Sequence, residues 1–489
     1  MKHVTLFMVV VLLCGSLLAQ EEKNAAVEIN LEELTHSILS QNLGVKVADT
    51  EKKIPEAAVL VQESIFDTLF SASTDYFYDK KEPANSVFGR KSTTYNYALG
   101  LDKKLPIGLG LALDFKNTLT TSDSSFSQRR LWDTSFGLSI TQELVRNYFG
   151  FMDRKQLQAK EEQARAAQNK SYRDIETIVA SGHEAYWNLS FAQENLKIRE
   201  GNLQLAHQLH KINKERLELG LIEKSDFHAS AAHVERAKAE LELANMTLEE
   251  ARIALRNLLN QAEEQIPYAA QDGLLFAKKS FSKDEAFRIA FEMRQDLQSL
   301  KKTVEAQKLI VRVASNNRLP QIDVKGSITT NGLDRNYGQS LEELGHGISP
   351  QYGIGFFITY PFENSSARGT YQAEKAQKKK LLLQLGQLDQ NIQSEVKNAM
   401  NQLTSLAQAT EKRIAAEKLL NDKLKAEVTQ LKQGRSSIDV VIQDHERLLA
   451  ARTDTALSIR DHNIAWMKLQ LAQGTLLNGY ENQLTEINL

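Results

Sequence analysis

The sequence has 489 residues, of which 42% are hydrophobic and 25% are charged. Its 60 basic and 62 acidic side chains give a formal net charge of −2, and this balance argues against nucleic acid or an anionic membrane surface as a partner. The single cysteine, Cys14, lies close to the N-terminus. The rest of the chain therefore contains no disulfide, no thiolate metal site and no cysteine nucleophile.

The first element in chain order is an apolar run from Val4 to Leu13, preceded by Lys2 and followed by small residues up to Ala19. This pattern predicts a secretory signal peptide over residues 1–19. The run is shorter than the roughly 20 apolar residues of a membrane-spanning anchor. Lipidation of Cys14 is an alternative, although the leucine before it is larger than the residue that lipoprotein processing requires.

After this peptide the chain repeats one pattern. Asn30 and Ser282 each stand before a helical stretch with a glutamate three positions later, which is a capping-box pattern, and they are 252 positions apart. Gly220 and Gly434 each end a long helical stretch and are 214 positions apart. The sequence therefore predicts an internal duplication.

The duplication sets the expected domain boundaries. We expect a first repeat over residues 20–262, made of a helix, strands and a long helical hairpin, and a second repeat over residues 282–489. Residues 263–281 mix polar and apolar side chains with a proline and a glycine, which is typical of a connector. A short strand is expected there, around Leu274–Phe276.

Long helices are expected where proline is absent. The seven prolines leave residues 107–266 and 362–489 without this helix breaker. From about Phe151 to Leu219 the chain is rich in helix-forming residues, and such a helix would extend about 100 Å. Two apolar series recur in sevens on opposite flanks of it, one through Leu189 and one through Phe191. Two apolar series on opposite flanks predict a helix that packs between two neighbouring helices in a cylindrical wall, and we call these series the apolar seams.

Six segments alternate with a period of two residues, as β-strands with one apolar face do. These segments lie near residues 66–78, 95–101, 107–115, 132–140, 322–328 and 352–360. The residues between the apolar ones are mostly Gly, Ser, Thr, Asp or Lys. Such segments are typical of a membrane β-barrel, although a soluble sandwich also alternates. Because a barrel needs about eight strands to close, one chain would close it only as an oligomer.

With these elements in place, the sequence resembles the outer membrane efflux channel family of the TolC type over nearly the whole mature chain. The motifs that carry the resemblance are Trp132–Gly150, Arg318–Ile322, and the turns Leu219–Leu221 and Gly434–Ser436. Where the family usually has Gln-Pro-Leu before a long helix, the first copy has Glu143 in place of the proline. The second copy keeps the proline as Pro361.

The resemblance implies an α+β membrane protein, internally duplicated. A long, coiled-coil-like α-helical barrel in the periplasm would continue into a transmembrane β-barrel shared among three subunits, with four strands from each. The first copy is longer by 34 residues among its strands. We expect this additional segment, around Tyr95–Phe115, to form a hairpin at or beyond the external end of a twelve-stranded barrel. Six strands from each subunit, in an eighteen-stranded trimer, are the alternative.

The resemblance also implies a function and partners. The chain would be the passive exit duct of a tripartite efflux pump or a type I secretion system, embedded in outer membrane lipid and extending into the periplasm. It would work as a homotrimer with a periplasmic adaptor (membrane fusion) protein and an inner-membrane transporter, and would carry solutes or polypeptides. The alternative function is a secreted coiled-coil scaffold with adhesive β segments.

The sequence shows no enzyme motif. A phosphate-binding glycine loop, an HExxH pair and a nucleophile elbow are all missing, so we expect neither enzymatic activity nor a cofactor. His207 and His210 are three positions apart, and His228 and His233 are five apart. We expect these histidines to be polar surface and assign no metal ligand to them.

The candidate site implied by the resemblance lies at the two helix tips. Asp226 and Asp439 match the family's aspartates that narrow the tunnel, and Arg435 matches an arginine that ties helix pairs shut. Asp226 follows its tip glycine by six positions and Asp439 by five, so the second copy is expected to lack one residue here. Asp226 as a helix cap is the alternative. The tip residues expected to contact the adaptor are Leu219, Gly220, Leu221, Gly434, Arg435 and Ser436.

Overall fold

The computed structural model describes residues 26–80, 91–122, 130–261, 267–347 and 349–480. The expected signal peptide therefore lies outside the described residues. The chain divides into two compact units. The helical unit comprises Met1–Glu51, Asn169–Gln298 and Gln387–Leu489, and the sheet unit comprises Lys52–Gln168 and Ser299–Gly386.

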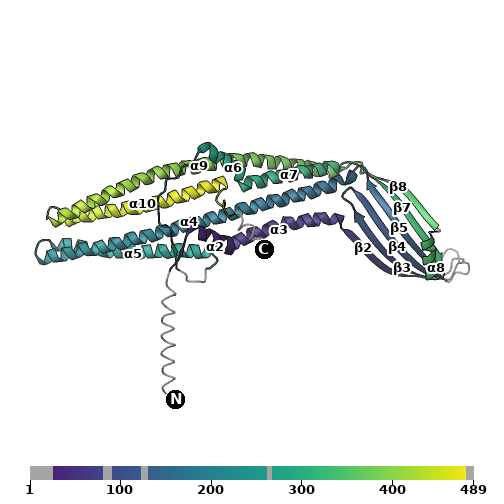
Figure 1. Ribbon diagram of the computed structural model, residues 1–489, viewed down its shortest axis with the longest axis horizontal. Coiled ribbons are helices and arrows are strands. Elements are labelled where there is room, and N and C mark those ends of the chain that lie inside the picture. The colour runs from purple at the N-terminus through teal and green to yellow at the C-terminus, as the bar shows by residue number, and fades with distance from the viewer. Residues whose placement is uncertain (1–25, 81–90, 123–129, 262–266, 348, 481–489) are drawn as a thin grey trace, which may run out of the picture. The chain divides into compact units, whose positions relative to one another are not determined.

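Helices make up most of the described chain (Figure 1). The helices and short 3-10 turns are α2 (Leu31–Gln41), α3 (Leu43–Glu63), η2 (Ser64–Phe66), η4 (Tyr148–Gly150), α4 (Phe151–Glu218), α5 (Lys224–Leu258), α6 (Lys283–Met293), α7 (Gln295–Asn316), α8 (Tyr337–His346), α9 (Ser365–Lys432) and α10 (Ile438–Gln473). The expected long helix from Phe151 is confirmed as α4, and α4 and α9 have 68 residues each.

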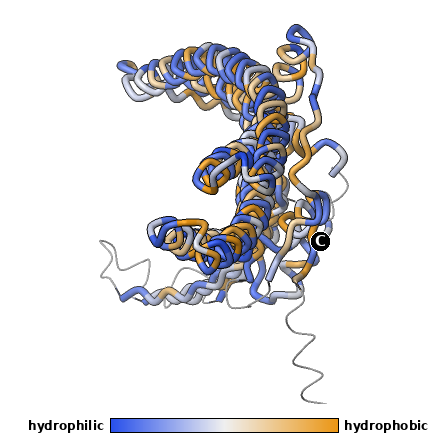
Figure 2. Tube along the Cα trace, turned by 90° about the vertical axis from the view of Figure 1, so that its left-hand side faces the viewer, coloured by the Kyte–Doolittle hydropathy of each residue, from blue (hydrophilic) through white to orange (hydrophobic). Residues whose placement is uncertain are grey.

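Hydrophilic and hydrophobic residues are mixed along the helices, as Figure 2 shows. Within the described residues, no helix is both long enough and apolar enough to cross a membrane.

Corresponding helices begin at constant separations. The starts of α2 and α6 are 252 positions apart, as are those of α3 and α7. The starts of α4 and α9 are 214 apart, and so are those of α5 and α10. The first helix start has the expected capping box between Asn30 and Glu33, whereas Ser282, at the equivalent position, makes no side-chain cap bond.

The same symmetry appears at the break between each pair of short helices. Asn42, between α2 and α3, donates from Nδ2 to the Leu258 backbone oxygen over 2.6 Å. Arg294, between α6 and α7, donates to the Ala472 backbone oxygen over 3.4 Å. Both acceptors lie at the C-terminal ends of their helices, where backbone oxygens lack intrahelical partners. In each repeat, a side chain at the break between two short helices thus supplies a donor to the C-terminal end of α5 or α10.

A two-stranded parallel sheet joins the first described residues to the connector. β1 (Val27–Ile29) pairs with β6 (Tyr268–Ala270). The strand expected around Leu274–Phe276 is therefore misplaced, because the connector strand lies earlier. Tyr268 is 6% exposed and packs into the core of the helical unit, whereas Leu275 is 76% exposed. Burial of the tyrosine ring favours the observed register.

The apolar series of α4 that runs through Leu189 packs into the core of the helical unit. Leu189 is fully buried there with Ile38 and Leu255. Toward the tip, Ile212 is 37% exposed and Leu219 is 73% exposed. One chain therefore covers the middle of the helix but leaves apolar residues uncovered near its end.

The sheet unit contains one antiparallel sheet of six strands in the order β2-β3-β4-β5-β7-β8. Its strands are β2 (Thr68–Asp79), β3 (Ser92–Lys104), β4 (Leu109–Ser122), β5 (Arg130–Glu143), β7 (Gln321–Asp334) and β8 (Ser349–Thr359). All six expected strands are present. The expected external hairpin around Tyr95–Phe115 is wrong, because β3 and β4 lie between β2 and β5 and pair with them along their length. That position satisfies the backbone groups that a projecting hairpin would leave unpaired on its outer sides.

The two faces of the sheet differ in chemistry. The register places large apolar residues such as Leu101, Leu113 and Ile140 on one face. The charged strand residues of the other face are acidic Asp75, Asp79, Asp102, Asp114, Asp133, Glu143 and Asp323, and basic Lys104, Lys116 and Lys325. The polar face therefore carries more negative than positive charge.

α8 covers part of the apolar face at β5 and β7. The hydroxyl groups of Thr134 and Ser340 are 2.8 Å apart, and both side chains are fully buried. A Cβ atom at Gly332 would lie 1.9 Å from the Ser340 backbone oxygen. Glycine at this position thus allows the helix to approach the strand and to bury two hydroxyl groups against each other.

Candidate functional site

The two helix tips are built by the same turn. Gly220 and Gly434 have φ of +69° and +73°, the left-handed region that favours glycine. Gly220 donates its N–H to the Leu217 oxygen and Leu221 to the Arg216 oxygen, each over 2.9 Å. These two bonds form a Schellman motif, which ends a helix sharply. Gly434 and the residue after it make the corresponding bonds in the second copy.

The expected adaptor-contact residues lie on the surface of these turns. Leu219 is 73% exposed and Leu221 is 67% exposed, although both are large and apolar. Gly220, Gly434 and Arg435 are also exposed. Ser436 is half-buried, and its hydroxyl donates to the Glu427 carboxylate. The first turn thus exposes two large apolar side chains.

The two aspartates occupy different positions after their turns. Asp226 is the third residue of α5, and Asp439 is the second residue of α10. Because the tip glycines and the helix starts are both 214 positions apart, Asp226 corresponds to Val440 and Asp439 to Ser225. The second copy has one residue fewer between glycine and aspartate because the two aspartates occupy non-equivalent positions, while the turns themselves have equal length. The structure brings each aspartate next to its own turn.

The alternative role for Asp226, that of a helix cap, is wrong. The N-cap of α5 is Glu223, and no side chain caps it. Asp226 accepts a bond from Asn213 through its backbone oxygen over 3.2 Å. Its carboxylate lies in the first helical turn, where the helix dipole stabilises an anion without a capping bond.

A buried carboxylate near the second tip escaped the sequence analysis. Asp444 is 2% exposed, and its Oδ1 accepts from Lys423 over 2.6 Å and from Arg447 over 3.0 Å. It links α9 to α10 beside an apolar cluster that contains Val441 and Leu448. Its spacing of three and four positions from these two residues is that of a core-facing side chain, and this was the available signal.

The histidines of α4 and α5 match only in part the expectation that they are polar surface. His207 and His228 are exposed as expected, but His233 is 6% exposed. Burial lowers the pKa of His233, and Arg236 lowers it further. Across the described part of the chain, no three His, Cys, Asp or Glu residues are grouped so that they could hold a metal ion.

His445 lies buried between the two hairpins. Its Nε2 and the Asn202 side-chain oxygen are 2.9 Å apart, which joins α10 to α4. Burial lowers the pKa of His445 to about 4, and the nearby His233 and Arg452 add to this effect. The ring is therefore neutral at physiological pH.

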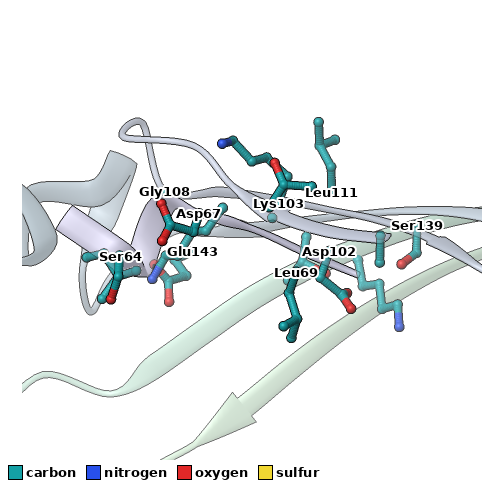
Figure 3. Close-up of a pocket in the computed structure, with 16 residues that line it drawn as sticks. Ser64, Asp67, Leu69, Asp102, Lys103, Gly108, Leu111, Ser139 and Glu143 are labelled. Carbon is teal, nitrogen blue, oxygen red and sulfur yellow. Dashed lines mark ion pairs between the residues drawn. The ribbon is translucent and has the colours of Figure 1, made fainter. Parts of the chain in front are cut away.

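The sheet unit contains a recess of about 890 Å³ at the end of the strands where η2 and the β3–β4 turn lie (Figure 3). Its charged residues are Asp67, Asp102, Lys103, Lys104, Glu143 and Lys325. Ser139, Thr141 and two glycines contribute polar or open backbone surface. The lining thus combines three acidic and three basic side chains with hydroxyl groups and apolar side chains.

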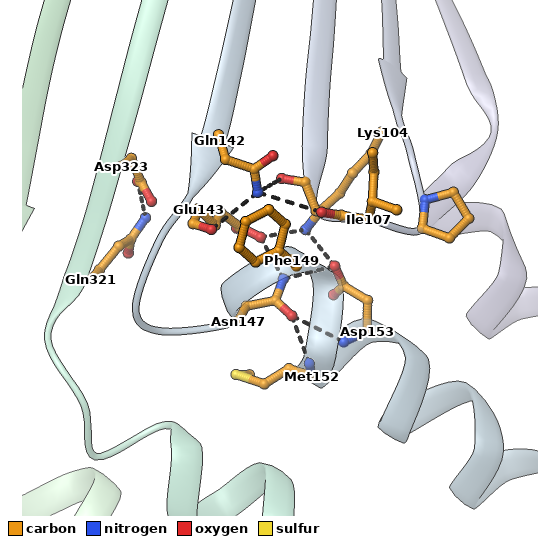
Figure 4. Close-up of polar contacts among 12 residues, drawn as sticks. Lys104, Ile107, Gln142, Glu143, Asn147, Phe149, Met152, Asp153, Gln321 and Asp323 are labelled. Carbon is orange, nitrogen blue, oxygen red and sulfur yellow. Dashed lines mark hydrogen bonds and ion pairs between the residues drawn. The ribbon is translucent and has the colours of Figure 1, made fainter.

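Beside the recess, Asn147 organises the junction between β5 and α4 (Figure 4). Its side chain donates to Glu143 over 2.5 Å and to Asp153 over 2.7 Å, and accepts from the Met152 and Asp153 N–H groups. Its backbone N–H donates to Asn316 over 2.9 Å. Its φ is +59°, a conformation that asparagine tolerates better than most residues.

Lys104 connects the additional hairpin to this junction. Its Nζ lies 2.8 Å from Asp153 and 3.5 Å from Glu143, the residue that replaces the family's usual proline. Arg154 donates to the Pro106 oxygen over 2.6 Å, so the β3–β4 turn rests on the start of α4. The additional strands are thus fixed to the helix as well as to the sheet.

Replacing Asn147 with alanine should lower the free energy of unfolding by about 2–4 kcal/mol, because four side-chain hydrogen bonds are lost and alanine disfavours this backbone conformation. Asn147→Gly loses the same bonds but accepts the positive φ, so it should be about 1 kcal/mol less harmful. Thermal unfolding of the detergent-solubilised variants measures both. Equal loss in the two variants would show that backbone conformation does not contribute.

Comparison with known proteins connects this arrangement to one family. The model of the family described as outer membrane efflux protein matches residues 86–261 and 287–475. The search of curated proteins found no match.

Solved structures show the same fold. The chain is similar to the CmeC outer membrane channel of Campylobacter jejuni, with 16% identity, a TM-score of 0.68 and coverage of 95% of this chain and 92% of that chain. It is similar to the outer membrane protein VceC of Vibrio cholerae, with 15% identity, a TM-score of 0.67 and coverage of 91% and 96%. It is also similar to the MtrE outer membrane channel of Neisseria gonorrhoeae, with 17% identity, a TM-score of 0.67 and coverage of 91% and 89%.

Proposed function

Because the chain belongs to the outer membrane efflux protein family, we propose that it is the passive exit duct of a tripartite efflux pump or a type I secretion system. It resides in the outer membrane, extends into the periplasm and serves export of solutes or polypeptides. The six-stranded sheet with one apolar face carries this proposal, since a lipid-facing barrel wall needs that pattern. A secreted scaffold gains no support from the family.

Fractionation tests this function most directly. The full chain should sediment with outer membranes and be extracted by detergent as an oligomer of a single size. A protein recovered in the soluble periplasmic or extracellular fraction would overturn the proposal and favour the scaffold. We expect no enzymatic activity and no cofactor, since a conduit requires neither.

Closure of the duct requires several copies, and we propose a homotrimer. In the described sheet, β2 and β8 each have one strand neighbour and one open edge. The strand number is even, so β8 of one copy runs antiparallel to β2 of the next. Three copies would close eighteen strands with the apolar face toward outer membrane lipid, and would leave no open edge.

The strand number has a measurable consequence. Barrel diameter grows roughly in proportion to strand number. Removing residues 91–122 deletes β3 and β4 and lets β2 pair with β5, so the diameter should fall to about two-thirds and the single-channel conductance of an open pore to about half. Electron microscopy of the unmodified oligomer provides an independent diameter. A twelve-strand diameter there would contradict six strands per subunit even if the deletion variant fails to assemble.

The duplicated organisation supports two equivalent repeats around one duct. We propose a first repeat over residues 20–262, a connector over 263–281 and a second repeat over 282–489. The constant separations between helix starts support these boundaries. Each repeat would add one long hairpin to the periplasmic part of the wall.

Partners would bind at the tips of these hairpins. We propose that Leu219, Gly220, Leu221, Gly434, Arg435 and Ser436 contact the periplasmic adaptor, which joins the duct to an inner-membrane transporter. The exposure of Leu219 and Leu221 supports this surface. Rigid glycine turns would present these side chains in a fixed geometry.

We also propose that Asp226, Asp439 and Arg435 form the gate. In a trimer each aspartate forms a ring of three carboxylates, which attracts cations and narrows the opening. Asp439→Ala should therefore raise single-channel conductance severalfold in planar bilayers and weaken cation selectivity. Asp422→Ala, an equal charge change at a site 59% exposed on α9, is the matched control. Unchanged conductance and selectivity in Asp439→Ala would count against this gate.

A further inference from the structure

A cavity of about 570 Å³ lies in the helical unit, apart from the tips and the recess. α4 contributes His183 and Trp187, and α10 contributes Trp466 and Met467. Leu31 at the start of α2, the connector and the residues after α10 complete its walls. Its volume is in the range of pockets that hold small organic molecules.

The lining has a marked charge asymmetry. The described residues that line the cavity include no aspartate or glutamate, and Lys279 is the lysine among them. The Lys279 ammonium lies 5.8 Å from the ring centre of Trp466, and no ion pair engages it within the described chain. Its neighbour Lys278, in contrast, forms an ion pair with Glu411 over 2.8 Å. Among the described residues, the cavity thus holds a cation without an acidic partner.

His183 does not add a second charge. Thr35 donates its hydroxyl proton to the Leu31 oxygen and therefore accepts from His183 Nε2 over 2.8 Å. Burial lowers the pKa of His183 to about 4, so the ring is neutral at physiological pH. Among the described lining residues, Lys279 is therefore the one that supplies positive charge.

The walls are held in place by contacts that do not involve a ligand. The Leu476 N–H donates to Glu176 over 3.2 Å, and Glu176 pairs with Arg173 over 2.6 Å. Arg173 also donates to the Leu471 oxygen over 2.8 Å. The segment after α10 is thereby tied to α4, and a preformed pocket binds with less loss of conformational entropy.

We propose that this cavity binds a small amphiphilic anion, an aromatic or short acyl body that carries one carboxylate. The body packs against the indole rings of Trp187 and Trp466, which offer large apolar faces. The carboxylate pairs with Lys279, which gains a partner that the described residues do not supply. This inference is independent of the proposed export function, because it rests on the lining of a single chain.

The chain provides its own reporter, since two of its three tryptophans line the cavity. Titration of the detergent-solubilised full chain with 1-naphthoate should quench tryptophan fluorescence to saturation. The neutral analogue 1-naphthalenemethanol should bind about tenfold more weakly, because it lacks the charge that Lys279 pairs with.

Two lysine variants localise the effect. Lys279→Met should weaken binding of 1-naphthoate about tenfold and leave that of the neutral analogue unchanged. Lys278→Met, the same change one position away, should leave both unchanged. Quenching that does not saturate, or that is equal in Lys279→Met and the unmodified chain, would overturn the proposal. So would full quenching in a Trp187→Phe, Trp466→Phe double variant, which would place the ligand elsewhere.

Discussion

Replacing Arg294 with methionine should lower the free energy of unfolding by about 1.5–3 kcal/mol, the usual contribution of hydrogen bonds to charged groups, because the arginine is buried while its partners Asp296 and Glu395 are 26% and 52% exposed. Arg294 is 2% exposed and donates to Asp296 over 3.0 and 2.6 Å and to Glu395 over 2.5 Å. Its additional bond to Ala472 closes the end of α10. Methionine fills much of the volume but leaves both carboxylates without their cation.

The pKa of Asp296 shows how strongly its carboxylate interacts with Arg294. Burial by itself would raise the pKa, but hydrogen bonds and charge attraction from Arg294 outweigh burial and keep it below the usual range. A carboxyl group with a lowered pKa stabilises the fold above its unfolded pKa and loses that contribution as the pH falls. Arg294→Met should therefore remove part of the acid dependence of stability along with the ion pair.

Arg288→Met is the matched control on α6. Arg288 pairs with Glu292 over 3.0 Å, but its side chain is 59% exposed. Exposed pairs of this kind contribute less than about 1 kcal/mol. Chemical or thermal unfolding followed by far-ultraviolet circular dichroism compares the two variants. A loss in Arg294→Met no larger than that in Arg288→Met would contradict the assigned role.

Acidification should destabilise the helical unit between about pH 6.5 and pH 4. Burial lowers the pKa of His183 and that of His445 to about 4, whereas an unfolded histidine has a pKa of about 6.5. The unfolded chain therefore binds protons first as the pH falls. The stabilisation from keeping each ring neutral and buried is fully present above the unfolded pKa. By pH 4 the free energy of unfolding has fallen by about 3 kcal/mol for each ring.

Glutamine variants test this assignment. His183→Gln and His445→Gln keep a polar side chain that can bond to Thr35 and Asn202, but they do not titrate. Each should flatten the dependence of the thermal midpoint on pH in this window. His346→Gln, at a position 64% exposed, is the control and should leave the slope unchanged. A slope unaffected by all three substitutions would place the acid-sensitive groups elsewhere.

The sequence predicted the elements well where the signal is local. The absence of proline and the helix-forming composition located α4 to within one residue of its observed end at Glu218. Alternation located all six strands, because the period of two residues is a property of each strand alone. The duplication was visible because glycine turns and helix starts keep a fixed spacing.

Pairing between distant segments was harder to predict. Alternation fixes which face a residue occupies but not which strand lies beside which, so the position of β3 and β4 within the sheet was missed. The bond between Lys104 and Asp153 joins residues from the additional hairpin and the long helix, and no local pattern indicates it. The spacing of Asp444 from Val441 and Leu448 does indicate a core-facing side chain, but the sequence does not show that Lys423 on another helix lies opposite it.

Insertion of the hairpin in the middle of the sheet has an implication for how such ducts change size. β3 and β4 form an up-and-down pair, so each of the other four strands would keep its direction and its connection to the helices without them. The outer strands β2 and β8 also stay the same, and with them the open edges of the described sheet. In the proposed oligomer, one additional hairpin per subunit would thus widen the bore and leave unchanged the strand edges through which the copies would pair.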